Sequence, residues 1–126
     1  CYFAGKIGLG VALDYGYELG LAETWSRIER LAQALRDDLS SLPGVTVWDK
    51  GVRKCGIVTF TKNGIGATEA KSKLAKSRIN VSASGMQLTR EDLKAAGIDQ
   101  MVRASVHYFN TDGEVEKLVA AVRALD

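Results

Sequence analysis

The strongest constraint in the sequence is one long amphipathic segment, residues 22–42, that runs up to the only proline of the chain. Its apolar side chains recur at intervals of three and four residues: Trp25, Ile28, Leu31, Ala32, Leu35, Leu39 and Leu42. This spacing predicts a helix with one continuous apolar face, and Pro43 with Gly44 marks its end. Such a stripe belongs in a hydrophobic core, so we assign it no functional role.

The rest of the chain alternates between short strand patterns and helix patterns. Four segments rich in β-branched or alternating apolar residues are predicted to be strands: residues 45–48, 54–60, 79–84 and 102–109. Helical spacing predicts further helices over 67–78, between Thr89 and Gly97, and after a capping box formed by Thr111 and Glu114. This order predicts an α+β fold, a four-stranded, largely antiparallel sheet with helices packed on one face.

Composition limits the functional classes that remain. The 126 residues are 46% hydrophobic and 25% charged, as expected for one globular domain with a real core. The net charge of +2 is too balanced for a nucleic-acid or anionic-membrane binding protein. No apolar run reaches the roughly 18 residues of a membrane span, and two cysteines make no disulfide scaffold. We therefore expect a cytoplasmic protein with neither a nucleic-acid nor a membrane partner.

Residues 4–19 also show helical spacing, but with five glycines in or next to the segment, which indicates that another backbone packs closely against it. The glycines do not match a dinucleotide or Walker phosphate loop. The chain begins at Cys1 instead of a methionine and enters this helix almost at once. We expect a piece of a longer protein; the alternative, a mature lipoprotein, would need a flexible polar tether after Cys1.

The last predicted strand offers the clearest candidate site. Strand alternation places Val102, Ala104, Val106 and Tyr108 on one side, and Arg103, Ser105 and His107 on the other. The apolar side belongs against the helices, so the polar side points toward solvent, a ligand or another domain. A guanidinium at position 103 suits bidentate binding of a carboxylate, but a structural salt bridge explains it equally well at this stage.

No self-sufficient catalytic set is visible elsewhere. His107 is the only histidine, so a histidine-rich metal site is impossible and a zinc site lacks ligands. A lone histidine on a strand is more often a structural hydrogen-bonding residue than a catalytic one. Cys55 falls inside a predicted apolar strand, where a cysteine behaves as a small buried hydrophobic residue. Four basic residues of the helix over 67–78 are best explained as a solvated helix face: Lys71, Lys73, Lys76 and Arg78.

The segment 102–119 strongly resembles the carboxy-terminal signature of class V, fold-type I, pyridoxal-phosphate enzymes. The matching positions are Arg103, Ser105, Phe109, Asn110, Thr111 and Glu114. The resemblance extends to Leu42-Pro43-Gly44-Val45, to residues 56–60 and to residues 78–82. The family includes aminotransferases, which are transferases, together with cysteine desulfurases, selenocysteine lyases and isopenicillin N epimerase-like proteins.

The resemblance implies a role for the whole chain. Residues 1–126 would be the carboxy-terminal small domain of a larger enzyme, with residues 1–20 forming the helix that arrives from the large domain. Arg103 would bind the α-carboxylate of an amino-acid or related amine substrate, with Ser105 and His107 on the same active-site face. The intact enzyme would use pyridoxal 5'-phosphate as an electron sink and would be a homodimer.

The resemblance also implies what this chain lacks. The Schiff-base lysine and the residues that bind the cofactor belong to the large domain, so we expect no catalytic residue, no metal, no bound cofactor and no activity in these residues alone. Desulfurases carry their persulfide-forming cysteine on the loop that corresponds to residues 85–101, which holds no cysteine here. This favours an aminotransferase-, lyase- or epimerase-like role. The alternative is a stand-alone α+β module that binds a small carboxylate or a protein partner without catalysis.

Overall fold

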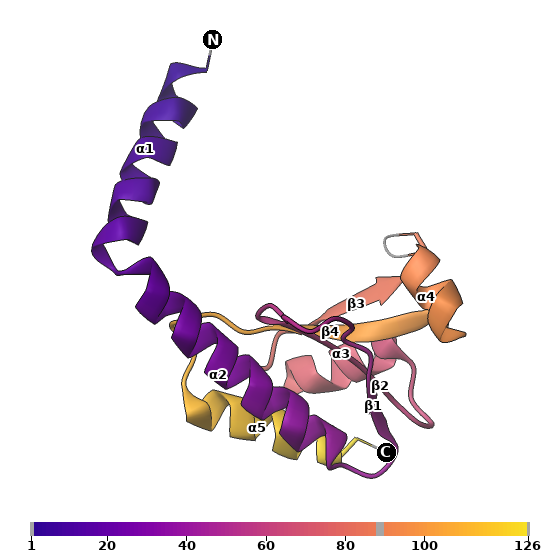
Figure 1. Ribbon diagram of the computed structural model, residues 1–126. Helices are drawn as coiled ribbons and strands as arrows, with labels where there is room; N and C mark the ends of the chain where they lie inside the picture. Colours follow the sequence, from indigo (N-terminus) through magenta and orange to yellow (C-terminus); the bar gives the residue numbers. More distant parts are fainter. Residues whose placement is uncertain (1, 88–89, 126) are drawn as a thin grey trace.

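The computed structural model describes residues 2–87 and 90–125 (Figure 1). These residues form five helices and four strands in the order α1 (Phe3–Glu18), α2 (Leu21–Ser40), β1 (Val45–Val47), β2 (Ile57–Lys62), α3 (Ala67–Lys76), β3 (Ser82–Gly85), α4 (Arg90–Ala96), β4 (Gln100–Ser105) and α5 (Asp112–Arg123). The predicted elements are therefore present in the predicted order. Thr89, the expected first cap of α4, and Cys1 lie outside the described residues.

The four strands form one antiparallel sheet in the order β1-β2-β4-β3. The central strand β4 pairs with β2 on one side and with β3 on the other. Its Arg103 has Thr59 of β2 and Ser82 of β3 as its two neighbours across the ladder. Because directly opposed residues in an antiparallel sheet share a face, these three side chains form one polar row.

The hydrophobic core lies between the sheet and the helices α2, α3 and α5, which cover one of its faces (Figure 1). The largest fully buried side chains of this core are Leu31, Leu35 and Leu39 of α2, Val58 and Phe60 of β2, Leu74 of α3, Val102 of β4 and Val122 of α5. The burial of one side of β4 matches the predicted alternation, because Val102, Ala104 and Val106 are buried while Arg103, Ser105 and His107 are exposed. The predicted α+β fold is thus confirmed.

Two arginines of α2 fix the segment that leads from β4 to α5. Arg27 donates from Nε to the carbonyl oxygen of Tyr108 at 2.6 Å and from Nη2 to that of Asn110 at 2.8 Å. Arg30 pairs with Asp112 at 2.6 Å, and both side chains are exposed. These carbonyls are therefore engaged by α2, and the chain turns here instead of continuing as a strand.

All four strands differ from their predicted bounds. β3, for example, begins at Ser82 and not at residue 79, and two of the differences concern residues discussed above. β4 ends at Ser105, so Tyr108, expected on its apolar side, lies in the turn that Arg27 holds and is half-buried. β2 begins at Ile57, so Cys55 lies in the preceding loop and is exposed. The expectation of a buried Cys55 is therefore wrong. Gly56 packs closely against Val106, the residue that follows β4. Its carbonyl accepts the Val106 N–H at 2.7 Å, and a Cβ at position 56 would lie 2.5 Å from the Val106 oxygen.

α1 extends away from the rest of the molecule (Figure 1). None of its residues is buried, and a Cβ added at Gly8, Gly10 or Gly16 would meet nothing within 4 Å. The expected close packing of this helix is therefore not found within the described chain. α1 turns into α2 at Gly20, whose φ of +81° is a conformation that side-chain-bearing residues rarely adopt. None of the described helices is both long enough and apolar enough to cross a bilayer.

Candidate functional site

A cavity of about 470 Å³ lies beside Arg103. Its floor includes Thr59 and Arg103, which are on the sheet face opposite the core. One wall is the loop between β1 and β2, residues 48–56, and another is the end of α4 with the residues that follow it, Ala96 and Ile98. The site is therefore built where the central strands meet two connecting segments.

Arg103 is exposed on this face. Among residues 2–87 and 90–125 its guanidinium forms none of the ion pairs, which are Arg30–Asp112, Arg36–Asp49 and Lys73–Glu69. A structural salt bridge for Arg103 is thus not observed within the described chain. The planar group is left available for an anionic ligand in the cavity, and a carboxylate fits it with two parallel hydrogen bonds.

The charges that line the cavity are almost all positive. The lining includes Arg36, Lys50, Arg53, Lys54 and Arg103, whereas Asp49 is the one carboxylate among the described lining residues. That carboxylate is already engaged, because its Oδ2 accepts from Arg36 Nε at 2.7 Å and its Oδ1 from the Thr59 hydroxyl at 2.6 Å. The remaining cations give the cavity a positive potential that favours a carboxylate or another anion.

The buried pair Arg36–Asp49 was not found from the sequence. Both side chains are almost inaccessible, with 5% and 8% of their surface exposed. A signal was available, because Arg36 is a charged residue four positions after Ala32 and three before Leu39, on the apolar face of α2. A charge at such a position requires a buried partner. The partner itself could not be identified from the chain order.

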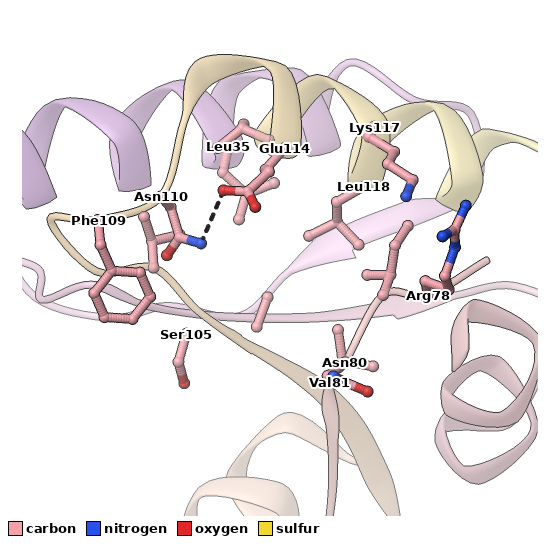
Figure 2. Close-up of a pocket in the computed structure, with 14 residues that line it drawn as sticks. Leu35, Arg78, Asn80, Val81, Ser105, Phe109, Asn110, Glu114, Lys117 and Leu118 are labelled. Carbon is pink, nitrogen blue, oxygen red and sulfur yellow. Dashed lines mark hydrogen bonds between the residues drawn. The ribbon is translucent and has the colours of Figure 1, made fainter. Parts of the chain in front are cut away.

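The structure does not bring the three predicted site residues into one cavity. Ser105 lines a second cavity of about 400 Å³ (Figure 2). His107 lies beyond the end of β4, where its ring stacks on Phe109 with centroids 4.9 Å apart. Its backbone N–H donates to Asn110 Oδ1 at 2.9 Å. Arg103 is therefore the predicted residue that the cationic cavity contains.

The second cavity lies between the end of β4, the residues before β3 and α5 (Figure 2). Arg78 and Lys117 lie on the same side of this cavity and point toward one another (Figure 2). Arg78 follows closely after α3 and has a φ of +59°. Lys73 of that helix pairs with Glu69 at 3.1 Å, in keeping with a solvated basic face. At the other side of the cavity Asn110 Nδ2 donates to Glu114 Oε2 at 3.2 Å.

Hydrogen bonds at the start of α5 shift the titration of Glu114. The Thr111 N–H donates to the Glu114 carboxylate at 2.9 Å, and the Glu114 N–H donates to the Thr111 hydroxyl at 3.2 Å, which completes the predicted capping box. The bond from the Thr111 backbone and then the bond from Asn110 lower the pKa of Glu114 below its ordinary value. The hydrogen bond between the side chains of Tyr108 and Tyr15 of α1 raises the pKa of Tyr108, so α1 contacts this segment at Tyr15.

The lysines and the carboxylate that line the 470 Å³ cavity do not have the environment of cofactor-binding groups. No group of three His, Cys, Asp or Glu side chains within residues 2–87 and 90–125 could hold a metal ion. Lys50 and Lys54 lie on the loop of the 470 Å³ cavity, where Lys50 is exposed and Lys54 half-buried, so neither has the enclosed environment of a Schiff-base lysine. Asp49, which could pair a pyridinium nitrogen, is engaged by Arg36 and Thr59.

Comparison with known proteins places the chain in a family. The family model "Aminotransferase class-V" matches residues 2–118. A probable cysteine desulfurase of Halalkalibacterium halodurans is 32% identical over 115 residues, which are 91% of this chain and 28% of that protein. A probable cysteine desulfurase of Xylella fastidiosa is 28% identical over 119 residues, 94% of this chain and 28% of that protein.

Solved structures agree with the family match. The cysteine desulfurase of Thermococcus onnurineus superposes with a TM-score of 0.89 at 25% identity, and the match covers 97% of this chain and 30% of that one. A C-DES mutant whose structure contains glycine covalently linked to its pyridoxal phosphate cofactor superposes with a TM-score of 0.67 at 23% identity, covering 83% of this chain and 24% of that one. This chain therefore spans less than a third of the length of these relatives, and it belongs to the class V aminotransferase family.

Proposed function

We propose that this chain is the small, substrate-carboxylate-binding domain of a larger pyridoxal-phosphate enzyme. The observation that carries the proposal is Arg103: an exposed guanidinium with no ion pair among the described residues, in a cavity whose other unengaged charges are positive. It occupies the arginine position of the family signature. Such a group binds and orients the α-carboxylate of an amino acid, which leaves the α-carbon in a fixed position for the reaction.

The rest of the intact enzyme supplies what this chain does not contain. Relatives are more than three times as long, and the lining of the 470 Å³ cavity offers no enclosed lysine and no free carboxylate to hold the cofactor. We assign the cofactor and its chemistry as an electron sink to that remaining part. α1 forms the connection to it, because its apolar residues have no cover within the described chain.

The proposed reaction acts on an amino acid or a related amine and is not a desulfuration. The named relatives are desulfurases, but residues 85–101 of this chain hold no cysteine to accept a persulfide sulfur. Cys55 lines the cavity from a different segment, the loop before β2. An aminotransferase, lyase or epimerase reaction needs no such nucleophile and agrees with the residues present.

The first experiment is to read the coding sequence on either side of this segment and to express the intact protein with pyridoxal phosphate. A large α/β domain with a Schiff-base lysine supports the proposal; a coding sequence limited to this segment contradicts it and favours a stand-alone binding module.

The second experiment tests Arg103 in the intact protein. Arg103→Lys keeps the charge but loses the paired hydrogen bonds, each charge-assisted bond being worth roughly 1.5–3 kcal/mol, so kcat/KM for α-amino acids should fall by about 10- to 150-fold. Amine analogues without the carboxylate should lose far less. Arg123→Lys, the same change on the exposed surface of α5, is the matched control. Equal losses for both substrate types, or loss of folding, would make Arg103 a structural residue.

A further inference from the structure

We propose that the buried pair of Arg36 and Asp49 is a positioning device for the Arg103 site. It holds the loop of residues 50–54 at a fixed place beside the cavity, so that the cations on this loop face the same anionic group as Arg103. This inference rests on the proposed role of Arg103 and adds residues that do not themselves touch the substrate.

The Arg36 guanidinium forms three hydrogen bonds to the residues at the two ends of the loop, which we call its neck. Nε donates to Asp49 Oδ2 at 2.7 Å, on the side where the loop begins. Nη2 donates to the carbonyl oxygens of Cys55 at 2.6 Å and Ile57 at 2.9 Å, on the side where it ends. A single side chain from α2 therefore connects both ends of the loop to the hydrophobic core.

Asp49 extends this connection to the neighbour of Arg103. Its Oδ1 accepts both the backbone N–H of Thr59 at 2.8 Å and the Thr59 hydroxyl at 2.6 Å. Thr59 is the residue directly opposite Arg103 in the ladder between β2 and β4. We call these five hydrogen bonds of Arg36 and Asp49 the clamp. The clamp joins α2, the loop and the strand beside Arg103 in one continuous set.

The loop beyond its neck has little packing of its own. Gly51 has a φ of +91°, and Val52 is fully exposed. Arg53, Lys54 and Cys55 nevertheless line the cavity together with Arg103. Because the tip is not anchored by apolar contacts, the place of these side chains depends on the neck, which the clamp determines.

Stability alone is a poor reason for such a pair. A buried ion pair costs desolvation, and well-packed hydrophobic residues at the same positions are commonly as stable or more stable. What hydrophobic residues cannot provide is the directed set of bonds to two carbonyls, one N–H and one hydroxyl. The clamp therefore specifies a loop position, and the consequence of that position is the geometry of the cationic cavity.

Alkylation of Cys55 in the full-length protein tests this proposal without relying on enzyme activity. The probes are iodoacetate, a carboxylate, and iodoacetamide, its neutral counterpart, with the modified peptide quantified by mass spectrometry. The ratio of the two rates at Cys55 measures how strongly the cavity favours an anion, since the reactivity of the thiol itself cancels. We expect a ratio above that of an unfolded peptide containing Cys55.

Asp49→Asn distinguishes a positioning role of the pair from a purely electrostatic one, because the two predict opposite changes in the ratio of iodoacetate to iodoacetamide reaction. Removing a carboxylate makes the cavity more positive, so electrostatics alone would raise the preference for iodoacetate. Loss of positioning lets the loop move away from Arg103, and the ratio should fall by about two- to fivefold, the scale of a lost, partly screened charge contact. A ratio that rises or stays constant overturns the proposal.

Two further variants make the outcome specific. Glu69→Gln removes the carboxylate of the exposed Lys73–Glu69 pair on α3, which packs on the opposite face of the sheet, and should leave the ratio unchanged. Arg103→Gln should lower it. If Arg103→Gln lowers the ratio and Asp49→Asn does not, the clamp is wrong while the proposed function stands. If Arg103→Gln also leaves it unchanged, the carboxylate site itself is wrong.

The kinetic readout is the KM of the intact enzyme for an α-amino acid compared with the corresponding amine. A positioning role predicts that Asp49→Asn raises the KM for the amino acid alone, with little change for the amine, and this comparison decides the matter if Cys55 is shielded. Arg36→Lys, which keeps the charge but loses the planar group that bonds Asp49 and both carbonyls together, should shift both readouts in the same direction. It replaces Asp49→Asn as the deciding variant if the latter does not fold; no shift then overturns the proposal.

Discussion

The consecutive helices α1 and α2 are both rich in apolar residues, yet they use them differently. In α2 the apolar residues form one stripe, and Leu31, Leu35 and Leu39 are completely buried against the sheet and α5. In α1 the exposed large hydrophobic residues occupy two roughly opposite sides, with Ile7 and Val11 on one and Leu9 and Leu13 on the other. Arrangement, and not apolar content, decides which helix this chain can cover by itself.

The comparison explains what α1 requires. A helix that is apolar on more than one side is normally buried on more than one side. α2 has an amphipathic surface that a single sheet face satisfies, whereas α1 would need partners on both sides. This supports the proposal that the remaining part of a longer enzyme covers α1.

The largest expected effect comes from making the same substitution, leucine to alanine, once in α2 and once in α1. In the 126-residue chain Leu31→Ala should lower the free energy of unfolding by about 2–5 kcal/mol, because it leaves a cavity in a fully buried position. Leu13→Ala, on the exposed helix, should change it by less than about 0.5 kcal/mol. Urea unfolding of both variants measures the difference. Similar losses would mean that α1 is buried in this chain, for example by self-association.

Much of this contrast could be predicted from the sequence. The stripe of α2, the strand alternation around Arg103 and the capping box of Thr111 are local patterns, and the structure confirms each. The helical character of α1 was predicted correctly as well. Its packing was not, because periodicity shows that a helix has apolar sides but not whether the same chain contains a partner for them.

The errors at strand ends have a common physical cause. Cys55 and Tyr108 continue apolar strand patterns, yet the Cys55 carbonyl is taken by Arg36 and the Tyr108 carbonyl by Arg27. These bonds join residues 19 and 81 positions apart in the chain. Propensity over a few residues cannot register a side chain that arrives from such a distance, and the same limit hid the clamp beside Arg103.

A smaller effect distinguishes the glycines of the two regions. Gly8→Ala in α1 should stabilise the helix by about 1 kcal/mol in the 126-residue chain, since a Cβ there meets nothing within 4 Å. Gly56→Ala is the matched change in the folded body, where the added Cβ would lie 2.5 Å from the Val106 oxygen, and it should destabilise. Circular dichroism and thermal unfolding report both changes. In the intact protein the gain at Gly8 should disappear if another backbone packs on α1; a gain of the same size there would argue against a cover at this glycine.

The smallest expected effect concerns how helices begin. The N-cap residue of α1, Tyr2, forms no side-chain cap, whereas α5 begins with the capping box in which Glu114 accepts the Thr111 N–H. Because these hydrogen bonds favour the carboxylate, the pKa of Glu114 is lower in the folded state than its ordinary value of 4.5. The contribution of Glu114 to stability is therefore fully present above pH 4.5 and is lost as the pH falls below that value through the folded-state pKa.

Glu114→Gln should thus be less stable than the wild type at neutral pH, and the two unfolding curves should converge as the solution is acidified. Subtracting the two proteins removes the parallel titration of Asp112, whose pKa is also lowered, by the hydrogen bond from Arg30. A difference that is constant from neutral pH to well below 4.5 would show that the capping box does not depend on the charge of Glu114.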